Sequence, residues 1–150
     1  MQFNDTVVLD ASRDRVWQAL NNPQEIGRCI PGMESVEVYE EGRAFGGKAS
    51  IKVGSAALTF PARLTWIEQN APHGGRLRAT AVLAGHDFEG QGEVTLAENG
   101  DGQTTLTWQA NVVIPEALAS NPLTAQMARM FATRFLKGFF ECVEALLVSV

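Results

Sequence analysis

Residues 130–147 read MFATRFLKGFFECVEALL, and the mixture of apolar and charged side chains in this stretch decides the fold class. It holds four phenylalanines and three leucines, but also Arg134, Lys137, Glu141 and Glu144. A membrane-spanning helix needs about 20 consecutive residues with few or no charges. The charges exclude a transmembrane span and leave a helix whose apolar face must be buried against the rest of the chain or a partner.

A helical pattern extends over residues 123–147. At about 100° per residue, its polar side chains fall on one arc of roughly 140°: Gln126, Arg129, Thr133, Arg134, Lys137, Glu141 and Glu144. The opposite arc holds Met127, Phe131, Phe135, Phe139, Cys142, Val143 and Leu146. We expect so wide an apolar face to pack on a broad, curved antiparallel sheet. Met130 lies inside the polar arc, and Phe140 and Leu147 lie at its edge, which predicts a patch for a dimer or a larger partner.

The rest of the chain predicts that sheet. FNDTVVLD at residues 3–10 is typical of a strand, and ASRDRVWQALNN has helical spacing with Ser12 as N-cap. NPQEIGRCIPG at residues 22–32 predicts a second short helix with Pro23 in its first turn. From residue 33 to residue 114 the sequence follows a period-two pattern that is interrupted by turn sequences. This predicts six strands in a meander, or seven with the first strand. With no repeat or low-complexity linker, we expect residues 1–150 to form a single domain.

Several positions inside the predicted strands are small. The inward-facing candidates are Phe88, Gly90, Gly92, Val94 and Leu96 in one strand, Leu77, Ala79, Ala81 and Leu83 in another, and Phe45, Gly47, Ala49 and Ile51 in a third. Glycine and alanine inside strands leave space or allow another group to approach closely. We therefore expect a cavity between the sheet and the long helix.

Composition excludes several classes of protein. The net charge of −5 and the pI near 5.0 argue against nucleic-acid binding, which needs concentrated lysine and arginine. Cys29 and Cys142 are too few for a typical disulfide framework and lack the close spacing of a zinc site. The first residues have neither the basic nor the apolar region of a signal peptide. We expect a cytoplasmic protein with both cysteines as buried thiols.

The predicted order of elements resembles the helix-grip fold of the START-like (SRPBCC) superfamily. Within it, the chain is similar to the family of carbon monoxide dehydrogenase G-subunits. The similarity lies in DASRDRVWQALNNPQEIGRCIPGMESVE at residues 10–37, above all in VWQALNNP and CIPG, and in FEGQGEVTL and FFECVEALL further on. It covers most of the chain. Family members often have a glycine-rich turn where this chain has IPEALASNPLTAQ.

The resemblance implies an α+β fold in which a curved antiparallel sheet of about seven strands wraps around one long C-terminal helix, with two short helices after the first strand. It also implies a small hydrophobic ligand, such as a quinone, and an accessory role to a carbon monoxide dehydrogenase-type molybdenum hydroxylase. Many members carry a membrane-binding tail after the fold. A protein without that tail would either lack the membrane role or reach the inner face of the membrane through a partner.

Polar residues give little support for catalysis. His73 lies in the turn sequence APHGG, and His86 adjoins Asp87, but neighbours in a strand point to opposite faces. Asp87, Glu89 and Glu93 share the face opposite Phe88, which we expect to be solvated. The glycine-rich segments FGGKAS and GQGEV do not lead into a helix, so they predict no nucleotide site. We expect no cofactor, no metal and no catalytic residue.

Nine aromatic residues are the candidates for the cavity lining: Trp17, Phe45, Phe60, Trp66, Phe88, Trp108, Phe131, Phe135 and Phe139. Each could equally be an ordinary core residue. The first hypothesis is a non-enzymatic carrier of a small hydrophobic ligand. The second is an assembly or recruitment factor with a filled core and no ligand, and the third is an enzyme of the cyclase or hydratase type that uses His86. Small residues facing aromatic ones, without an acid–base pair, favour the first.

Overall fold

The computed structural model describes residues 1–30, 32–53, 55–83 and 85–148. It confirms the predicted order of elements and adds one short helix, α3. The strands are β1 (Gln2–Leu9), β2 (Glu37–Glu40), β3 (Ala44–Val53), β4 (Ala56–Asn70), β5 (Gly74–Leu83), β6 (His86–Glu98) and β7 (Thr104–Val113). The helices are α1 (Arg13–Leu20), α2 (Pro23–Cys29), α3 (Glu116–Ala119) and α4 (Pro122–Val148).

The two short helices begin at capping residues that the sequence supplies. Ser12 accepts a hydrogen bond from the Arg15 amide at the start of α1, and Asn22 accepts from two amides at the start of α2. These bonds satisfy N–H groups that have no partner in the first turn of a helix. Pro23, at the first turn of α2, gives up no hydrogen bond there.

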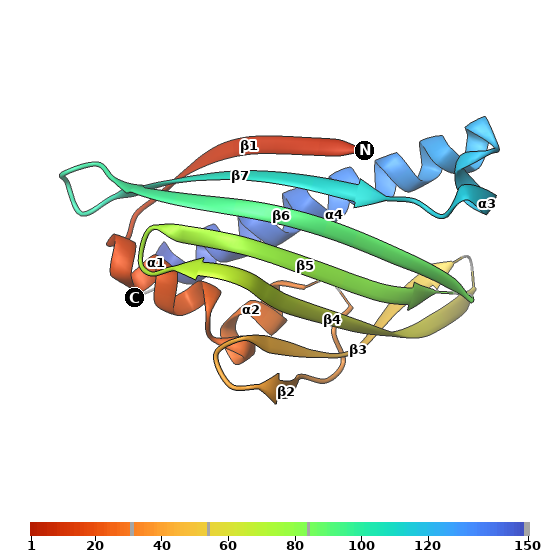
Figure 1. Cartoon of the computed structure of the whole chain (residues 1–150), viewed down its shortest axis with the longest axis horizontal. Coiled ribbons are helices and arrows are strands. Elements are labelled where there is room, and N and C mark those ends of the chain that lie inside the picture. Colours follow the sequence, from red (N-terminus) through yellow and green to blue (C-terminus); the bar gives the residue numbers. More distant parts are fainter. Residues whose placement is uncertain (31, 54, 84, 149–150) are drawn as a thin grey trace.

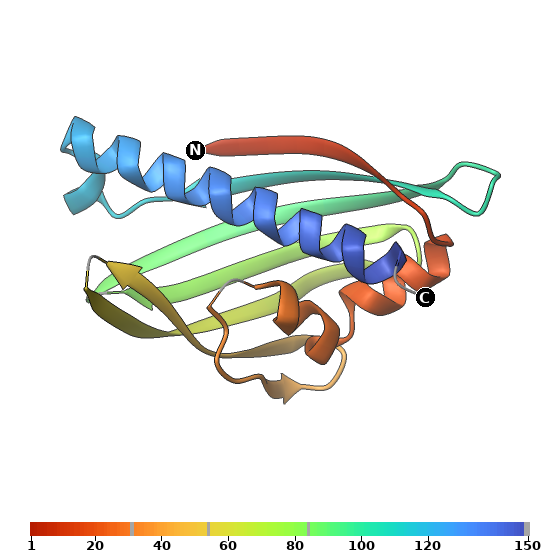
Figure 2. The same cartoon turned by 180° about the vertical axis from the view of Figure 1, so that it is seen from behind.

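The seven strands form one antiparallel sheet in the order β1-β7-β6-β5-β4-β3-β2. Consecutive strands from β2 to β7 are neighbours, and β1 pairs with β7 at the edge. Figure 1 shows the outer, convex face of this curved sheet, and Figure 2 shows α4 crossing the concave face diagonally. This is the helix-grip arrangement predicted from the sequence.

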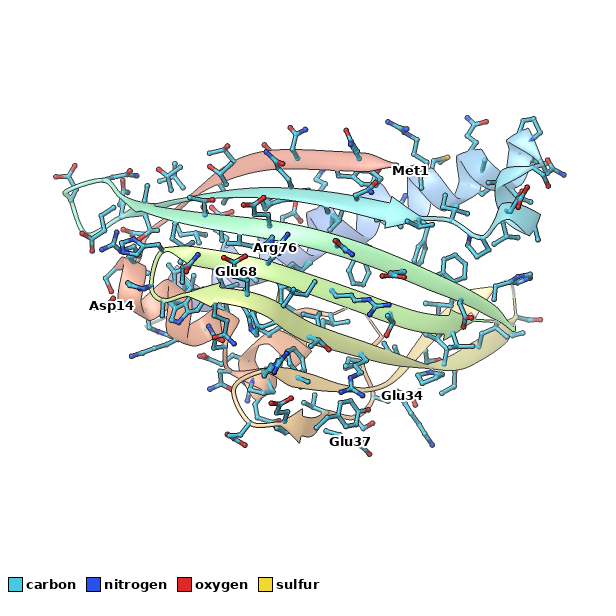
Figure 3. The ribbon with its side chains drawn as sticks, viewed as in Figure 1. Met1, Asp14, Glu34, Glu37, Glu68 and Arg76 are labelled. Atoms are coloured by element: carbon cyan, nitrogen blue, oxygen red, sulfur yellow. A yellow bond between two sulfur atoms is a disulfide. The ribbon has the colours of Figure 1, made fainter. Side chains whose placement is uncertain are left out.

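The outer face of the sheet carries ion pairs between neighbouring strands. Arg76 pairs with Glu68 at 3.2 Å, and Arg78 pairs with Glu89 at 2.7 Å. Figure 3 shows Glu68 and Arg76 lying beside each other on this face. Because side chains alternate between the two faces of a strand, the residues between them point toward α4.

The hydrophobic core lies between one end of the concave face, α1, α2 and the C-terminal half of α4. Trp108 of β7 stacks on Phe140 of α4 with ring centroids 4.7 Å apart. Trp66 of β4 packs against Trp17 of α1 at 5.2 Å. We call this the closed end of the molecule.

The predicted patch of Met130, Phe140 and Leu147 does not form. Phe140 is half-buried against Trp108, and Leu147 is 1% exposed, whereas Met130 is 50% exposed. The physical reason is that α4 packs against β1, α1 and α2 as well as facing the sheet, so its C-terminal half is covered over more than one arc.

A disulfide between Cys29 and Cys142 joins α2 to α4, with Cα atoms 5.3 Å apart. The prediction of two free thiols is therefore wrong, although Cys29 is 3% exposed and Cys142 is half-buried. The two cysteines are separated by 113 positions, and only the packing of α2 on α4 brings them together.

Gly32, in the CIPG sequence, requires the absence of a side chain. Its φ is +77°, and a Cβ there would overlap the carbonyl oxygen of Ser50. The Ser50 amide donates to the Gly32 carbonyl at 2.8 Å, which fixes the chain after α2 to β3. Pro31 of the same motif lies outside the described residues.

Candidate functional site

The concave face is buried at the closed end and uncovered at the other. In β6, the inward-facing Val94 and Leu96 are 8% and 2% exposed. Earlier in the same strand Phe88 and Gly90 are only half-buried, and Ala79 of β5 is exposed. Because these residues share one face, the helices cover only part of it. The uncovered part, which we call the open apolar face, consists of Phe60, Ala62, Ala79, Ala81, Phe88 and Gly90.

Small residues occupy the middle of the open apolar face. Ala81 of β5 pairs with Ala62 on one side and with Phe88 on the other, and Ala79 pairs with Gly90. A Cβ added at Gly90 would meet no atom closer than 3.6 Å, which is an ordinary contact distance. There is therefore room for a methyl group above the sheet at this point.

The first half of α4 does not cover this surface. Leu123, Met127, Met130 and Phe131 are 66%, 62%, 50% and 51% exposed, whereas Phe135 is half-buried. The expectation that the whole apolar arc of the helix is buried is wrong for Met127 and Phe131. The reason is visible in Figure 2, where the beginning of α4 extends beyond the end of β1.

The nine predicted lining residues divide into two groups. Those that belong to the core or pack against it are Trp17, Phe45, Trp66, Trp108 and Phe139. Those outside the core, half-buried or exposed, are Phe60, Phe88, Phe131 and Phe135. Sequence reasoning missed Ala62, although its small size at an inward position of a long strand was a usable signal.

Trp108 carries an unused donor. Its indole Nε1–H is buried and has no hydrogen-bond partner in the part of the chain that the structure describes. Buried N–H groups nearly always have a partner. Trp108 pairs with Val94, four residues along β6 from Gly90, which is about 13 Å at the usual rise of a strand. It therefore lies deeper along the concave face than the open apolar face does.

A groove of about 560 Å³ adjoins the open apolar face. It lies between the end of β7 and the beginning of α4, and its lining includes Val112, Val113, Ile114, Ala119, Ala125 and Arg129. Val112 is the cross-strand partner of Gly90, so the groove and the open apolar face share an edge. The Arg129 guanidinium lies 5.9 Å from the centre of the Phe3 ring.

A smaller depression of about 250 Å³ lies over β1, β7, β6 and β5, and side-chain amides such as those of Gln91, Gln109 and Asn111 line it. These amide side chains lie on the outer face of the sheet, and such a polar lining does not suit a hydrophobic ligand. We therefore place the candidate site on the concave side.

The polar candidates do not assemble into an acid–base pair. His86 is half-buried on the face of Phe88, while Asp87 is exposed on the opposite face. His73 is exposed, with Nδ1 3.2 Å from a guanidinium nitrogen of Arg13. Among the described residues, no group of three or more His, Cys, Asp or Glu side chains is placed to hold a metal. Over the same residues, no helix has the length and apolarity needed to cross a membrane.

The clearest electrostatic effect lies at the closed end. Arg15 of α1 donates two hydrogen bonds to the Glu25 carboxylate of α2, at 2.8 and 3.3 Å. These bonds lower the pKa of Glu25 and raise the pKa of Arg15, and they outweigh partial burial, which acts in the opposite direction. The pair fixes α1 to α2 and does not contribute to the open apolar face.

Comparison with known proteins gives a family and a fold. The CoxG family, described as the G-subunit of carbon monoxide dehydrogenase, matches residues 6–148. A conserved protein from Geobacillus kaustophilus is 18% identical, with a TM-score of 0.85 over 99% of this chain and 95% of that chain. No curated protein matches.

Two further solved structures show the same architecture. A START superfamily protein from Mycobacterium smegmatis is 12% identical, with a TM-score of 0.64 over 97% of this chain and 96% of that one. A protein from Thermus thermophilus is 13% identical, with a TM-score of 0.68 over 99% and 98% of the two chains. At these identities the structural matches establish the fold alone, which is START-like.

Proposed function

We propose a function from the premise that this chain belongs to the CoxG family of carbon monoxide dehydrogenase G-subunits: it is a non-enzymatic accessory protein that binds a small hydrophobic ligand on the open apolar face. The ligand would lie between β4, β5 and β6 and the first half of α4. Phe135 and Phe131 of α4 would contact it from the helix side.

The observation that carries this proposal is the incomplete covering of the concave face. Burying a phenylalanine side chain completely stabilises a protein by roughly 1.5–3 kcal/mol. Phe60 and Phe88 forgo part of this gain, and small residues lie between them where large ones would fill the curvature. Ligand sites are mostly apolar, concave and largely formed in advance. A hydrophobic ligand would complete the core that the chain leaves open.

A quinone-like molecule suits these residues. A flat ring can pack against the phenylalanines with offset or edge-to-face geometry. Family membership supports a carbon monoxide dehydrogenase-type molybdenum hydroxylase as the enzyme that this protein would serve.

Native mass spectrometry of gently purified protein, repeated after denaturation, tests for a bound ligand. We expect an extra mass that is absent after denaturation and whose value identifies the molecule. Titration with a short-tailed ubiquinone analogue, with quenching of tryptophan fluorescence as the readout, gives an affinity. This measurement does not depend on whether the natural ligand stays bound during purification.

Ala81→Leu provides the decisive variant, with Thr80→Leu as its matched control. Ala81 faces the open apolar face and is half-buried, whereas Thr80 is the neighbour on the outer face. We expect Ala81→Leu to weaken quinone binding at least tenfold without lowering the unfolding temperature, and Thr80→Leu to leave binding unchanged. Equal affinity of both variants and the parent protein would refute this location of the site.

A second function is favoured by a different observation, the exposure of Leu123, Met127 and Met130 at the start of α4. An assembly or recruitment factor would use such residues to bind its enzyme and would need no ligand. Three results together would support this second function. The protein would show no extra mass, it would not bind quinone, and it would capture a molybdenum hydroxylase that Met127→Ser does not capture. A cyclase or hydratase activity would instead have to be lost in His86→Ala.

A further inference from the structure

The outer face of the sheet carries charges in its middle but not along the edge formed by β1 and β7. Leu106 and Trp108 of β7 point into the core, so the residues that alternate with them point outward. Four cross-strand pairs make up this outward surface: Gln2 with Asn111, Asn4 with Gln109, Thr6 with Thr107, and Val8 with Thr105. We call these eight uncharged residues the neutral face, which lies along the top of the sheet in Figure 1. The ion pairs Arg76–Glu68 and Arg78–Glu89 lie beside it, on β4, β5 and β6.

The neutral face is open to solvent and partly hollow. Seven of its residues are exposed and Thr105 is half-buried. The depression of about 250 Å³ extends over it onto β6 and β5, and five carboxamides are among its lining side chains: Gln2, Asn4, Gln91, Gln109 and Asn111. In the described part of the chain, none of these carboxamides bonds to another protein group. Their donors and acceptors are therefore available to another molecule.

A lack of charge is unusual at the edge of a sheet. Edge strands commonly carry charged side chains, lysine above all, which keep other sheets away, and β1 is an edge strand. The centres of protein–protein contacts, in contrast, are depleted in charged residues. The composition of the neutral face is therefore that of a contact surface.

We propose that the neutral face binds the neutral face of a second copy of this chain, with a two-fold axis through its middle. A two-fold contact brings the same residues together from both copies. A charged face would meet its own charge, whereas a hydroxyl or a carboxamide both donates and accepts and can bond to its own copy. Two chains of net charge −5 repel each other, and the neutral face is where this repulsion is weakest.

The edge of β1 favours packing of faces over pairing of edges. Met1 bonds to Val112 of β7 through both its amino group and its carbonyl oxygen. Because the direction of the backbone groups alternates along a strand, the Thr6 amide points away from β7. It donates instead to the Asp5 carboxylate at 2.8 Å. Pairing of two β1 edges would break this bond and bring two Asp5 carboxylates toward each other.

The size of the contact sets its expected strength. With strands about 4.8 Å apart and about 3.4 Å per residue, eight residues of β1, β7 and the adjoining β6 cover about 14 Å by 27 Å. This footprint is smaller than the roughly 800 Å² that each partner buries in a standard interface. Because standard interfaces bind with micromolar to picomolar affinity, we expect a dissociation constant on the order of tens of micromolar. The open apolar face is on the other side of the sheet, so the dimer leaves it free and does not depend on a ligand.

Sedimentation velocity of the full chain at increasing concentration tests the proposal. We expect a monomer–dimer equilibrium in the parent protein. Thr107→Lys places a positive charge in the middle of both neutral faces and should weaken association at least tenfold. Thr59→Lys is its matched control, because Thr59 is exposed on the outer face of β4, next to the inward-facing Phe60. It should leave the equilibrium unchanged or strengthen it slightly, since both variants reduce the net negative charge.

A mixture of two variants distinguishes a direct contact from loss of folding. Thr107→Glu alone should also be monomeric, but an equimolar mixture with Thr107→Lys should associate again, because opposite charges then meet across the two-fold axis. A parent chain that is monomeric up to roughly 1 mM, a dimer that Thr107→Lys leaves intact, or a mixture that stays monomeric would overturn the proposal.

Another occupant of the neutral face would also overturn it. A chain that stays monomeric, but whose complex with a molybdenum hydroxylase is lost in Thr107→Lys, would assign this face to the enzyme. Ala81→Leu should leave the monomer–dimer equilibrium unchanged, so failure of the ligand site and failure of the dimer are separable.

Discussion

Removal of the disulfide between Cys29 and Cys142 should lower the free energy of unfolding by several kcal/mol. A cross-link restricts the unfolded chain, and the effect grows with the logarithm of the loop length. A separation of 113 positions is long for so small a protein. The chain-entropy relation gives about 4.8 kcal/mol for such a loop, and we expect about 3–5 kcal/mol because measured effects are often smaller than this relation predicts.

The location of the bond indicates that the fold should survive without it. Val143 and Leu147, which follow Cys142 in α4, are 0% and 1% exposed. We expect this burial to hold the end of α4 in the core when the bond is broken. Urea unfolding of Cys29→Ala/Cys142→Ala, monitored by tryptophan fluorescence, should therefore show a native baseline. The midpoint should lie at a lower urea concentration than in the parent protein. The unfolding temperature should fall by roughly 8–15 °C for a domain of this size.

Reduction of the parent protein provides the control. It should reproduce the double variant, and the double variant should not respond to the reductant. Two free thiols in the native, unreduced protein would show that the bond is absent. A bond that is present but changes the unfolding free energy by less than about 1 kcal/mol would refute the loop-entropy estimate.

Three further substitutions test other parts of the structure. Gly32→Ala should cost about 2–3 kcal/mol, because it adds overlap with Ser50 to a left-handed backbone, whereas Gly42→Ala, with φ +73° and no atom within 4 Å, should cost only about 1 kcal/mol in the same unfolding assay. Glu25→Gln should lower the free energy of unfolding by about 1 kcal/mol at neutral pH. Because the pKa of Glu25 is lower in the folded protein, the parent protein should be more stable than the variant by the full amount above the ordinary glutamate pKa. This difference should disappear as the pH falls through the lowered pKa. Trp66→Ala should cost about 3–5 kcal/mol, because Trp66 is 4% exposed, while Phe88→Ala should cost much less and weaken quinone binding instead.

Local patterns were sufficient to predict most of the fold. Period-two alternation identified the strands from β2 to β7 and the inward phase of Val94 and Leu96, because a half-buried strand must alternate. Ser12 and Pro23 marked the beginnings of α1 and α2. Among the described residues, the element that the sequence did not predict is α3, a single turn that is too short to show helical periodicity.

Other features depend on contacts between distant segments, which local patterns do not contain. The pairing of Cys29 with Cys142 follows from α2 lying on α4. The helical pattern predicted that Met127 and Leu146 lie on the same apolar face of α4. It could not show at which residue of α4 the supporting sheet ends. Exposure of Met127 and Phe131 is set by the position of α4 along β1 and the curvature of the sheet, both of which are tertiary properties.

The open apolar face also shows which residues carry information about a ligand site. Aromatic residues were the obvious candidates, yet Trp66, Phe45 and Trp108 pack in the core. Their replacement would lower stability whether or not a ligand binds, so it cannot test the proposed function. Ala79 and Ala81 are different, because large residues there would bury more surface and stabilise the empty protein. The proposed ligand would account for small residues beside partly exposed phenylalanines, whereas stability alone would not, and enlarging these small residues is the change that separates the two explanations.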